Sequence, residues 1–373
     1  MSYATPGPIE AKLKDAISPI EDIIEDARQG KMYILVDHED RENEGDLIIA
    51  GEFADADAVN FMATHGRGLI CLPMIASRID ALDLPMMAVN NSSRHETAFT
   101  VSIEAREGVS TGISAGDRAL TIATAINEQN TMAALATPGH VFPLRAKQGG
   151  VLVRAGHTEA SVDISRLAGL NPSAVICEIM KEDGSMARLP DLVEFAAVHN
   201  MKIGTISDLI AYRSRNDNLV VETSQCTVTS EFGGDWQMRL FTDQIHGIEH
   251  VVLIKGDITT PEPVLVRTHA QHEASDLLGL GPKPAGELQT AMRKIAEEGR
   301  GIVCLFRAPH SALYAAEDEG PRTIKETGMG AQILSSLGVK ELILLTDSPQ
   351  TTYLGLDAFD LAIVGTRPIM KDA

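Results

Sequence analysis

The spacing of apolar residues along the chain predicts a regular alternation of helices and strands. Apolar side chains three or four positions apart predict an amphipathic helix over residues 9–28, which Gly30 ends. The apolar runs 32–36 and 47–50 predict two strands with a polar loop between them. Further helices are predicted at 55–65, 119–128, 189–200 and 206–215, and further strands at 69–73, 99–103, 175–180 and 203–205.

The same pattern resumes beyond a polar, turn-prone stretch at 216–218, which we take as the domain boundary. Strands are predicted within 227–240 and at 250–255, 302–306 and 342–345, and helices at 287–298 and 333–337. A length of 373 residues also exceeds what one hydrophobic core usually holds. We therefore predict an α/β (α+β) protein with two domains, residues 1–215 and 219–373.

Composition and charge exclude several classes of function. The chain has 44% hydrophobic residues, but no apolar run approaches the roughly 20 residues that span a bilayer. Its first nine residues also lack the apolar core of a signal peptide. A net charge of −20 without clustered Lys and Arg excludes a nucleic-acid partner. A small phosphorylated substrate stays open, because it needs only a few local donors.

The cysteines predict a reduced protein. Four of them are scattered along the chain without any short spacing, so neither a disulfide framework nor a thiolate zinc site is expected. With no membrane segment, this predicts a cytoplasmic location.

The loop between the first two predicted strands, residues 37–46, is the leading candidate for chemistry. Six of its ten residues are acidic, and like charges repel one another unless a cation compensates them. Because α/β folds place their chemistry at the C-terminal ends of strands, we interpret the loop as a metal site. A solvated acidic turn is the alternative. A calcium loop of the EF-hand type is excluded, because such a loop requires glycine at its sixth position and this loop has Glu42 there.

Three other places carry candidate chemistry. Residues 110–118 combine hydroxyls with a helix start, which suits either a phosphate cradle or an ordinary N-cap. His140 follows a predicted Pro-Gly turn and His157 follows Gly156, and each is either functional or a hydrogen-bonded core histidine. Glu178 lies in the apolar run 175–180, where a buried carboxylate is either paired or an acid/base group, and we favour the second.

Several ordered motifs carry a family resemblance through residue 214. They are Asp40-Arg41-Glu42-Asn43-Glu44-Gly45-Asp46, Leu84-Pro85-Met86-Met87, Phe99-Thr100-Val101, the run from Pro138 to Arg145, the run from Gly156 to Ala160, and Cys177-Glu178. Together they resemble 3,4-dihydroxy-2-butanone 4-phosphate synthase of riboflavin biosynthesis. The resemblance implies a lyase that converts D-ribulose 5-phosphate to 3,4-dihydroxy-2-butanone 4-phosphate and formate. It also implies dependence on Mg²⁺ or Mn²⁺ and a homodimer formed through this domain.

The same resemblance implies roles for individual residues. Glu42 and His157 correspond to the metal ligands, and His140 and Glu178 to the essential acid/base pair. The implied substrate contacts are Arg41, Glu42, Asp46, Cys71, Thr111, Arg154, Ala155, Gly156, His157, Thr158 and Glu178. The other acids of the loop, including Glu39 and Glu44, then only tune its electric field.

These residue types suit the implied reaction. Removing a proton beside a ketone leaves negative charge on oxygen, which a divalent cation stabilises as a Lewis acid. A carboxylate, an imidazole and sugar oxygens together fit Mg²⁺ or Mn²⁺. The later proton transfers require groups that take and give protons near neutral pH, and Glu178 and His140 are of that type.

The second domain resembles GTP cyclohydrolase II, through the segments 267–270 and 297–302. That family binds zinc through three cysteines, but here the matching places hold His272, Lys283 and Ala285. The family's Arg-Gln-Glu-Gly-Arg signature is replaced by residues 307–311. We therefore expect no zinc and no hydrolysis of GTP. The alternatives are a bifunctional enzyme, with His269 and His272 in an improvised metal site, or a nucleotide-binding or scaffolding module.

Overall fold

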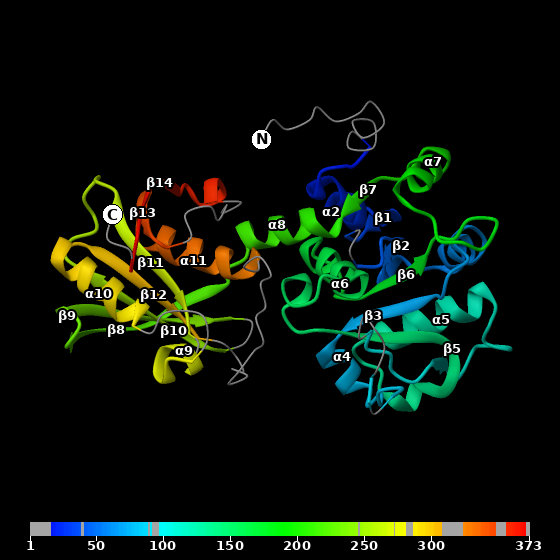
Figure 1. The fold of residues 1–373 in the computed structure, drawn as a ribbon. Helices are drawn as coiled ribbons and strands as arrows, with labels where there is room; N and C mark the ends of the chain where they lie inside the picture. The colour runs from blue at the N-terminus through cyan, green and yellow to red at the C-terminus, as the bar shows by residue number, and fades with distance from the viewer. Residues whose placement is uncertain are drawn as a thin grey trace. The chain divides into compact units, whose positions relative to one another are not determined.

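The structure is a computed structural model that describes residues 16–38, 41–88, 90–91, 97–244, 247–271, 273–280, 286–307, 324–347 and 356–370, with the backbone alone at 273–274, 324–328 and 357–358. The chain divides into two compact units, Met1–Tyr212 and Arg213–Ala373. Each unit contains a seven-stranded sheet with helices packed against it (Figure 1). The predicted α/β class is confirmed. Glu39 and the singled-out positions 272, 283, 285 and 308–311 lie outside the described residues.

The sheet of the first unit has the strand order β4-β5-β3-β6-β2-β1-β7. Its strands are β1 (Tyr33–Val36), β2 (Gly45–Ala50), β3 (Cys71–Ile75), β4 (Ile103–Ala105), β5 (Leu135–Ala146), β6 (Ala174–Glu178) and β7 (Ile203–Thr205). β1 pairs in parallel with β7, and β3 with β5, whereas the other neighbours are antiparallel. This order brings the start of β2 beside the end of β6, at the centre of the sheet.

Helices cover both faces of this sheet, so β1 and β2 are buried along their whole length. One face packs against α3, α4, α5 and α7, and the other against α2, α6 and α8. The helices are α2 (Ile20–Arg28), α3 (Ala56–Phe61), α4 (Ala76–Ala81), α5 (Ala115–Ile126), α6 (His157–Leu167), α7 (Leu189–His199) and α8 (Ile206–Asn216). Single turns of other helix types are η1 (Gly51–Phe53), η2 (Met62–Gly66), η3 (Met132–Ala134) and η4 (Gly150–Leu152).

The start of the first helix differs from the predicted one. The described part of 9–28 is helical only from Ile20, because Pro19 is its N-cap and disfavours a helical conformation in the residue before it. Before it, Ile17 forms an isolated bridge with Ile203. The predicted helix 119–128 instead begins at Ala115, because Ser114 accepts a hydrogen bond from the Asp117 amide and caps it.

Two predictions near the sheet are also corrected. The strand expected at 69–73 is observed as β3, which begins later, at Cys71, and ends at Ile75. The Pro-Gly turn expected before His140 is instead an irregularity within the long strand β5, where the register against β4 shifts. Glycine is needed there, since a Cβ on Gly139 would lie 2.0 Å from the Ile103 carbonyl oxygen.

The second unit has the strand order β14-β13-β11-β12-β10-β9-β8, antiparallel from β8 to β12 and parallel from β12 to β14. Its strands are β8 (Val220–Ser230), β9 (Gly234–Asp243), β10 (Glu249–Lys255), β11 (Val264–Ala270), β12 (Gly301–Phe306), β13 (Glu341–Leu345) and β14 (Ala362–Arg367). Its helices are α9 (Glu273–Leu278), α10 (Glu287–Glu298), α11 (Ile324–Ser336) and the 3-10 turn η5 (Leu356–Phe359). Trp236, Leu265 and Ile295 lie at its core.

The predicted run 227–240 lies within a hairpin formed by β8 and β9. Strands β11 and β14 were not predicted. Within the described residues, the helices are all too short or too polar to cross a membrane.

Candidate active site

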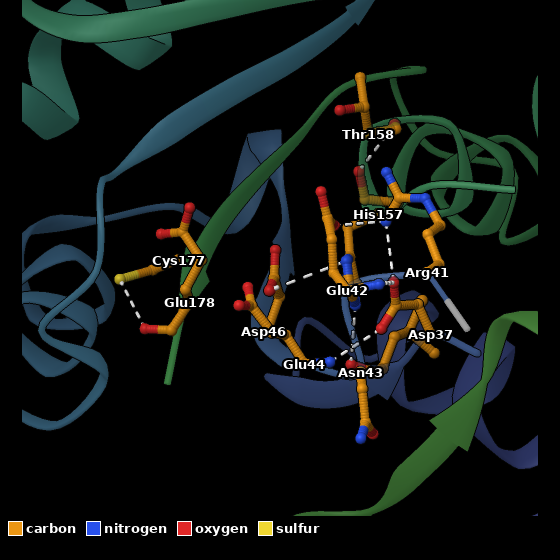
Figure 2. Close-up of polar contacts among 12 residues, drawn as sticks. Asp37, Arg41, Glu42, Asn43, Glu44, Asp46, His157, Thr158, Cys177 and Glu178 are labelled. Carbon is orange, nitrogen blue, oxygen red and sulfur yellow. Dashed lines mark hydrogen bonds and ion pairs between the residues drawn. The ribbon is translucent and has the colours of Figure 1, made fainter. Parts of the chain in front are cut away.

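The acidic loop joins β1 to β2 and is folded around Asp37. The buried Asp37 carboxylate accepts hydrogen bonds from the Glu44 amide at 2.8 Å, the Glu42 amide at 3.1 Å and Arg41 Nη1 at 2.9 Å. Burial opposes its ionisation, but the Glu44 amide and His157 outweigh that effect and lower the pKa of Asp37. Asp37 is therefore a charged group that fixes the shape of the loop (Figure 2).

His157 reaches this loop from the first turn of α6, and its ring is buried. Its Nε2 lies 3.2 Å from the Leu35 carbonyl oxygen, which can only accept a hydrogen bond. Nε2 therefore carries the hydrogen, and burial lowers the pKa of His157 and favours the neutral ring. Nδ1, 3.8 Å from Asp46 Oδ1, is left with a lone pair for a ligand or a proton.

These groups form a candidate cation site. Asp37, Glu42 and His157 each offer one ligand atom, and these atoms lie within 4.8 Å of one another. Two carboxylates and a neutral imidazole are donors that Mg²⁺ and Mn²⁺ accept. The structure thus brings together Glu42 and His157, the two predicted ligands, and adds Asp37, which the sequence offered only as one acid among six.

A pair of carboxylates lies beside this cluster. Asp46 at the start of β2 faces Glu178 at the end of β6 in the strand register (Figure 2). Burial, and then the charges of Glu178 and Glu42, raise the pKa of Asp46 well above its usual range. Cys71 at the start of β3 is paired with Ile176 of the same β6 strand, and burial followed by Glu178 raises the pKa of its thiol.

The placement of Glu178 differs from the predicted one, because it ends its strand and is partly exposed. Glu178 Oε2 accepts a hydrogen bond of 2.7 Å from the Leu69 amide. A Cβ on Gly68 would lie 2.4 Å from Glu178 Oε2 and 2.6 Å from its carbonyl oxygen. The turn that precedes β3 therefore holds this carboxylate by close backbone contact.

Two guanidinium groups converge at the N-terminus of α6. A Cβ on Gly156 would lie 2.5 Å from Arg154 Nη1 and 3.0 Å from Arg41 Nη2. Arg154 is oriented by Glu159 at 2.6 Å and by Thr97 Oγ1 at 3.1 Å. Burial raises the pKa of Glu159, and Arg154 opposes that rise. Two arginines beside helix-start amides are a candidate anion site. It lies in the predicted segment 154–158, where Thr158 is buried and Ala155 is exposed.

His140 belongs to a different group of residues. Its Nδ1 lies 2.5 Å from Glu104 Oε2, and the Glu104 carboxylate leaves no room for a side chain on Gly112. Within the part of the chain that the structure describes, no hydrogen bond or ion pair joins His140 or Thr111 to Glu178. The predicted acid/base pair is therefore not joined by a hydrogen bond.

The segment 110–118 forms an N-cap and not a phosphate cradle. The amides of Ser110 and Gly112 donate to Asp117 Oδ2, at 3.2 and 2.9 Å, and the Ser110 hydroxyl donates to the same oxygen. These donors, which a phosphate needs, are therefore taken by a carboxylate of the chain itself.

Sequence reasoning missed Glu104, Gly68 and Arg188 as members of this region. Glu104 sits in an ordinary alternating strand pattern, and Gly68 resembles any turn glycine. Arg188 Nη1 donates to the Glu42 carbonyl at 2.8 Å and also to the Asn43 carbonyl. Its place directly before an apolar helix with Pro190 was a helix-start signal, but it carried no hint of this partner.

The mixed sheet is covered by helices on both faces, and carboxylates and an imidazole lie beside two arginines. This arrangement is typical of an enzyme that acts on a small anionic substrate. Residues 21–212 match the 3,4-dihydroxy-2-butanone 4-phosphate synthase family, and residues 221–368 match GTP cyclohydrolase II. A 3,4-dihydroxy-2-butanone 4-phosphate synthase of Neisseria meningitidis is 43% identical over 363 residues, covering 95% of this chain and 99% of the relative.

Solved structures agree with this match. The two-domain 3,4-dihydroxy-2-butanone 4-phosphate synthase RibBX of A. baumannii superposes with a TM-score of 0.76 at 38% identity, covering 95% of this chain and all of its own. A synthase in complex with two magnesium ions matches 54% of this chain and 99% of its own, with a TM-score of 0.52 and 41% identity.

This chain belongs to the 3,4-dihydroxy-2-butanone 4-phosphate synthase family. It is an enzyme of riboflavin biosynthesis that converts D-ribulose 5-phosphate to 3,4-dihydroxy-2-butanone 4-phosphate and formate. The family and the activity that the motifs implied are both confirmed.

Proposed function

We propose that Glu42 and His157 are the protein ligands of a divalent cation, Mg²⁺ or Mn²⁺, in this synthase. The observation that carries the proposal is the meeting of Asp37, Glu42 and His157, with ligand atoms within 4.8 Å, although His157 comes from a distant helix. The similar synthase that binds two magnesium ions supports it. Because Asp37 already accepts three hydrogen bonds, we assign it the role of fixing the shape of the loop and not that of a metal ligand. A cation bound here supplies Lewis-acid stabilisation of negative charge on the substrate oxygens.

The phosphate of the sugar is assigned to the N-terminus of α6. Arg41 and Arg154 converge there on Gly156, the N-cap of α6, which has no side chain to cap the first amides of the helix. Arg154 is fixed by Glu159 and Thr97, so its guanidinium loses little freedom when the phosphate binds. Charge-assisted hydrogen bonds from both arginines then orient the sugar toward Glu42 and Asp46.

Glu178 and His140 are assigned the proton transfers. The Glu178 carboxylate is held by the Leu69 amide, beside an Asp46 whose raised pKa favours a carboxyl that donates to a sugar hydroxyl. Glu104 accepts a hydrogen bond from His140 Nδ1, which leaves Nε2 to take or give a proton. Cys71 and Thr111 are assigned to the lining of the pocket.

We assign the enzyme a homodimer formed through the first unit, a cytoplasmic location and no nucleic-acid partner. Exposed apolar side chains in this unit, Leu69, Met86, Met87 and Ile113, support an interface. The free cysteines support a reducing compartment, and the net charge of −20 opposes nucleic-acid binding. Sedimentation velocity is expected to show a dimer, and a monomer at assay concentration would contradict the assignment.

The second unit is assigned no GTP hydrolysis. Arg267 Nη2 lies 2.5 Å from Glu287 Oε1 and 3.3 Å from His269 Nδ1. His269 Nε2 lies 3.0 Å from Asp276 Oδ2, so both ring nitrogens of His269 already have neighbours. The only cysteines of this unit are Cys226, exposed on β8, and Cys304, buried in β12. These contacts weigh against an improvised metal site at His269.

The metal assignment is tested by formate release from ribulose 5-phosphate in the presence of Mg²⁺ or Mn²⁺. Wild type is expected to release formate, and chelation or Glu42→Ala is expected to abolish it. Full activity of Glu42→Ala would show that Glu42 is not a ligand.

The second unit is tested separately, with the full chain. No GTP turnover is expected when zinc is added, and turnover would establish the bifunctional alternative. Calorimetric titration with GTP distinguishes an inert unit from a nucleotide-binding module, because only the module releases or absorbs heat.

A further inference from the structure

Arg188 forms the bridge between helix α7 and the acidic loop. It directly precedes α7, and its side chain is half-buried. Nη1 donates to two successive carbonyls of the loop, at Glu42 (2.8 Å) and at Asn43. Asn43 adopts a left-handed φ of 53°, so the backbone reverses at the residue that Arg188 holds.

The base from which Arg188 acts is rigid. The Arg188 amide donates to Asp191 Oδ2 at 2.9 Å, which fixes the start of α7. Leu192, fully buried, packs so closely on the loop that a Cβ on Gly45 would lie 2.4 Å from Leu192 Cδ1. At the far end of α7, the centroid of the His199 ring lies 4.8 Å from that of the His65 ring, and the two rings are tilted by 53°. The guanidinium therefore has a defined position relative to the sheet.

Arg188 also brings positive charge to a region crowded with carboxylates. Arg41 lies within the loop, and its guanidinium contacts Asp37 and Glu42. Whereas the Arg41 guanidinium contacts carboxylates, the Arg188 guanidinium donates to the loop carbonyls of Glu42 and Asn43. It can therefore orient Glu42 without competing for the carboxylate oxygens that a cation needs.

We propose that Arg188 is a positioning residue for the cation site, which holds the backbone of Glu42 so that its carboxylate faces His157. The proposal rests on the proposed function, in which Glu42 is a ligand. Such outer contacts to ligand residues typically contribute about 10- to 100-fold in metal affinity or activity. Arg188 itself touches neither cation nor substrate in this assignment.

The test is a titration of metal-free, full-length protein with Mn²⁺, in which free Mn²⁺ is measured by electron paramagnetic resonance. Arg188→Met is expected to raise the Mn²⁺ dissociation constant about 10- to 100-fold. Arg188→Lys, which keeps the charge and loses the planar group, is expected to fall between this variant and wild type. The Mn²⁺ concentration for half-maximal formate release is expected to rise in parallel.

Arg78→Met is the matched control. Arg78 also donates to backbone carbonyls, of Ala125 at 2.8 Å and Asn127 at 2.7 Å, but at the end of α5. It is expected to lose thermal stability without any change in Mn²⁺ affinity.

Each outcome decides the question. If Arg188→Met binds Mn²⁺ as tightly as wild type while Glu42→Gln does not, the inference about Arg188 is wrong and the ligand assignment stands. If Glu42→Gln binds normally, the ligand assignment itself is wrong. Should Arg188→Met fail to fold, Arg188→Lys replaces it, and wild-type affinity in that variant overturns the inference.

Discussion

Asp46 and Glu178 are register partners on neighbouring antiparallel strands, so their two carboxylates lie side by side on one face of the sheet. Burial and the charge of Glu178 together raise the pKa of Asp46. A carboxyl whose pKa is higher in the folded chain costs stability when it ionises. This loss of stability is absent below the ordinary Asp pKa of about 3.9, and it grows as the pH rises toward the pKa of Asp46 in the folded chain.

Replacing Asp46 by Asn is therefore expected to stabilise the metal-free protein and to impair catalysis. At pH 8 the free energy of unfolding of Asp46→Asn should exceed that of wild type, because the variant has no carboxyl to ionise there. The gain should shrink as pH falls toward 4. Urea denaturation followed by circular dichroism measures it, with the exposed Asp57→Asn as control. Formate release should fall by up to roughly 10-fold, as for a weakened hydrogen bond between two neutral groups. A variant no more stable than wild type at pH 8 would show that Asp46 carries no such cost.

Gly68→Ala is expected to displace the Glu178 carboxylate. The added Cβ would meet the Glu178 backbone as well as Oε2, so the turn has to move. A misplacement of about 1 Å in a reacting group lowers turnover by about 100-fold. Steady-state kinetics should show the loss in kcat, and KM should change little because the phosphate contacts lie elsewhere.

Gly116→Ala is the matched control for this change. An added Cβ at Gly116 meets nothing within 4 Å, and alanine favours the helix in which it lies. Equal kcat values for Gly68→Ala and wild type would show that the turn before β3 does not position the Glu178 carboxylate for catalysis.

Gly156→Ala is expected to weaken binding of the phosphate while the fold stays intact. The new Cβ would meet the tips of the Arg154 and Arg41 side chains, which can move away without disturbing the backbone. The loss of one well-placed charge-assisted contact predicts a rise of about 10-fold in KM for ribulose 5-phosphate. Inorganic phosphate should inhibit the variant less strongly than wild type. An unchanged KM together with unchanged inhibition would place the phosphate elsewhere.

The native protein is expected to expose one reactive thiol. Cys226 on β8 is exposed, whereas Cys71, Cys177 and Cys304 are buried. Burial raises the pKa of Cys177 and Cys304 to about 12, so raising the pH to 9 does not produce their thiolates. A thiol-reactive chromogenic disulfide should titrate one group per folded chain and four after unfolding. Cys226→Ser should remove the fast group, and a second fast group in that variant would contradict the burial of the others.

Much of the framework follows from local sequence. The uninterrupted apolar runs of β1 and β2 identify strands buried on both faces, because a half-exposed strand would alternate. The periodicity of α10 predicted its bounds, Glu287–Glu298, because a glycine lies directly before and after it. The acidic loop was also recognisable, since six acids in ten residues require compensation.

What each acid of the loop contacts was decided by the tertiary structure. The apolar pattern does not show that Asp37 faces three donors or that Asp46 faces Glu178, because these contacts depend on strand register and on the folding of the loop. The pairing of His157 with Glu42 was implied only by the family resemblance, because it depends on the docking of α6. Arg188 is the clearest case. Its side chain resembles any arginine before a helix, and only the packing of α7 places it against the Glu42 and Asn43 carbonyls. Local sequence sets which segments are helices and strands, whereas contacts between distant residues form only when those segments pack.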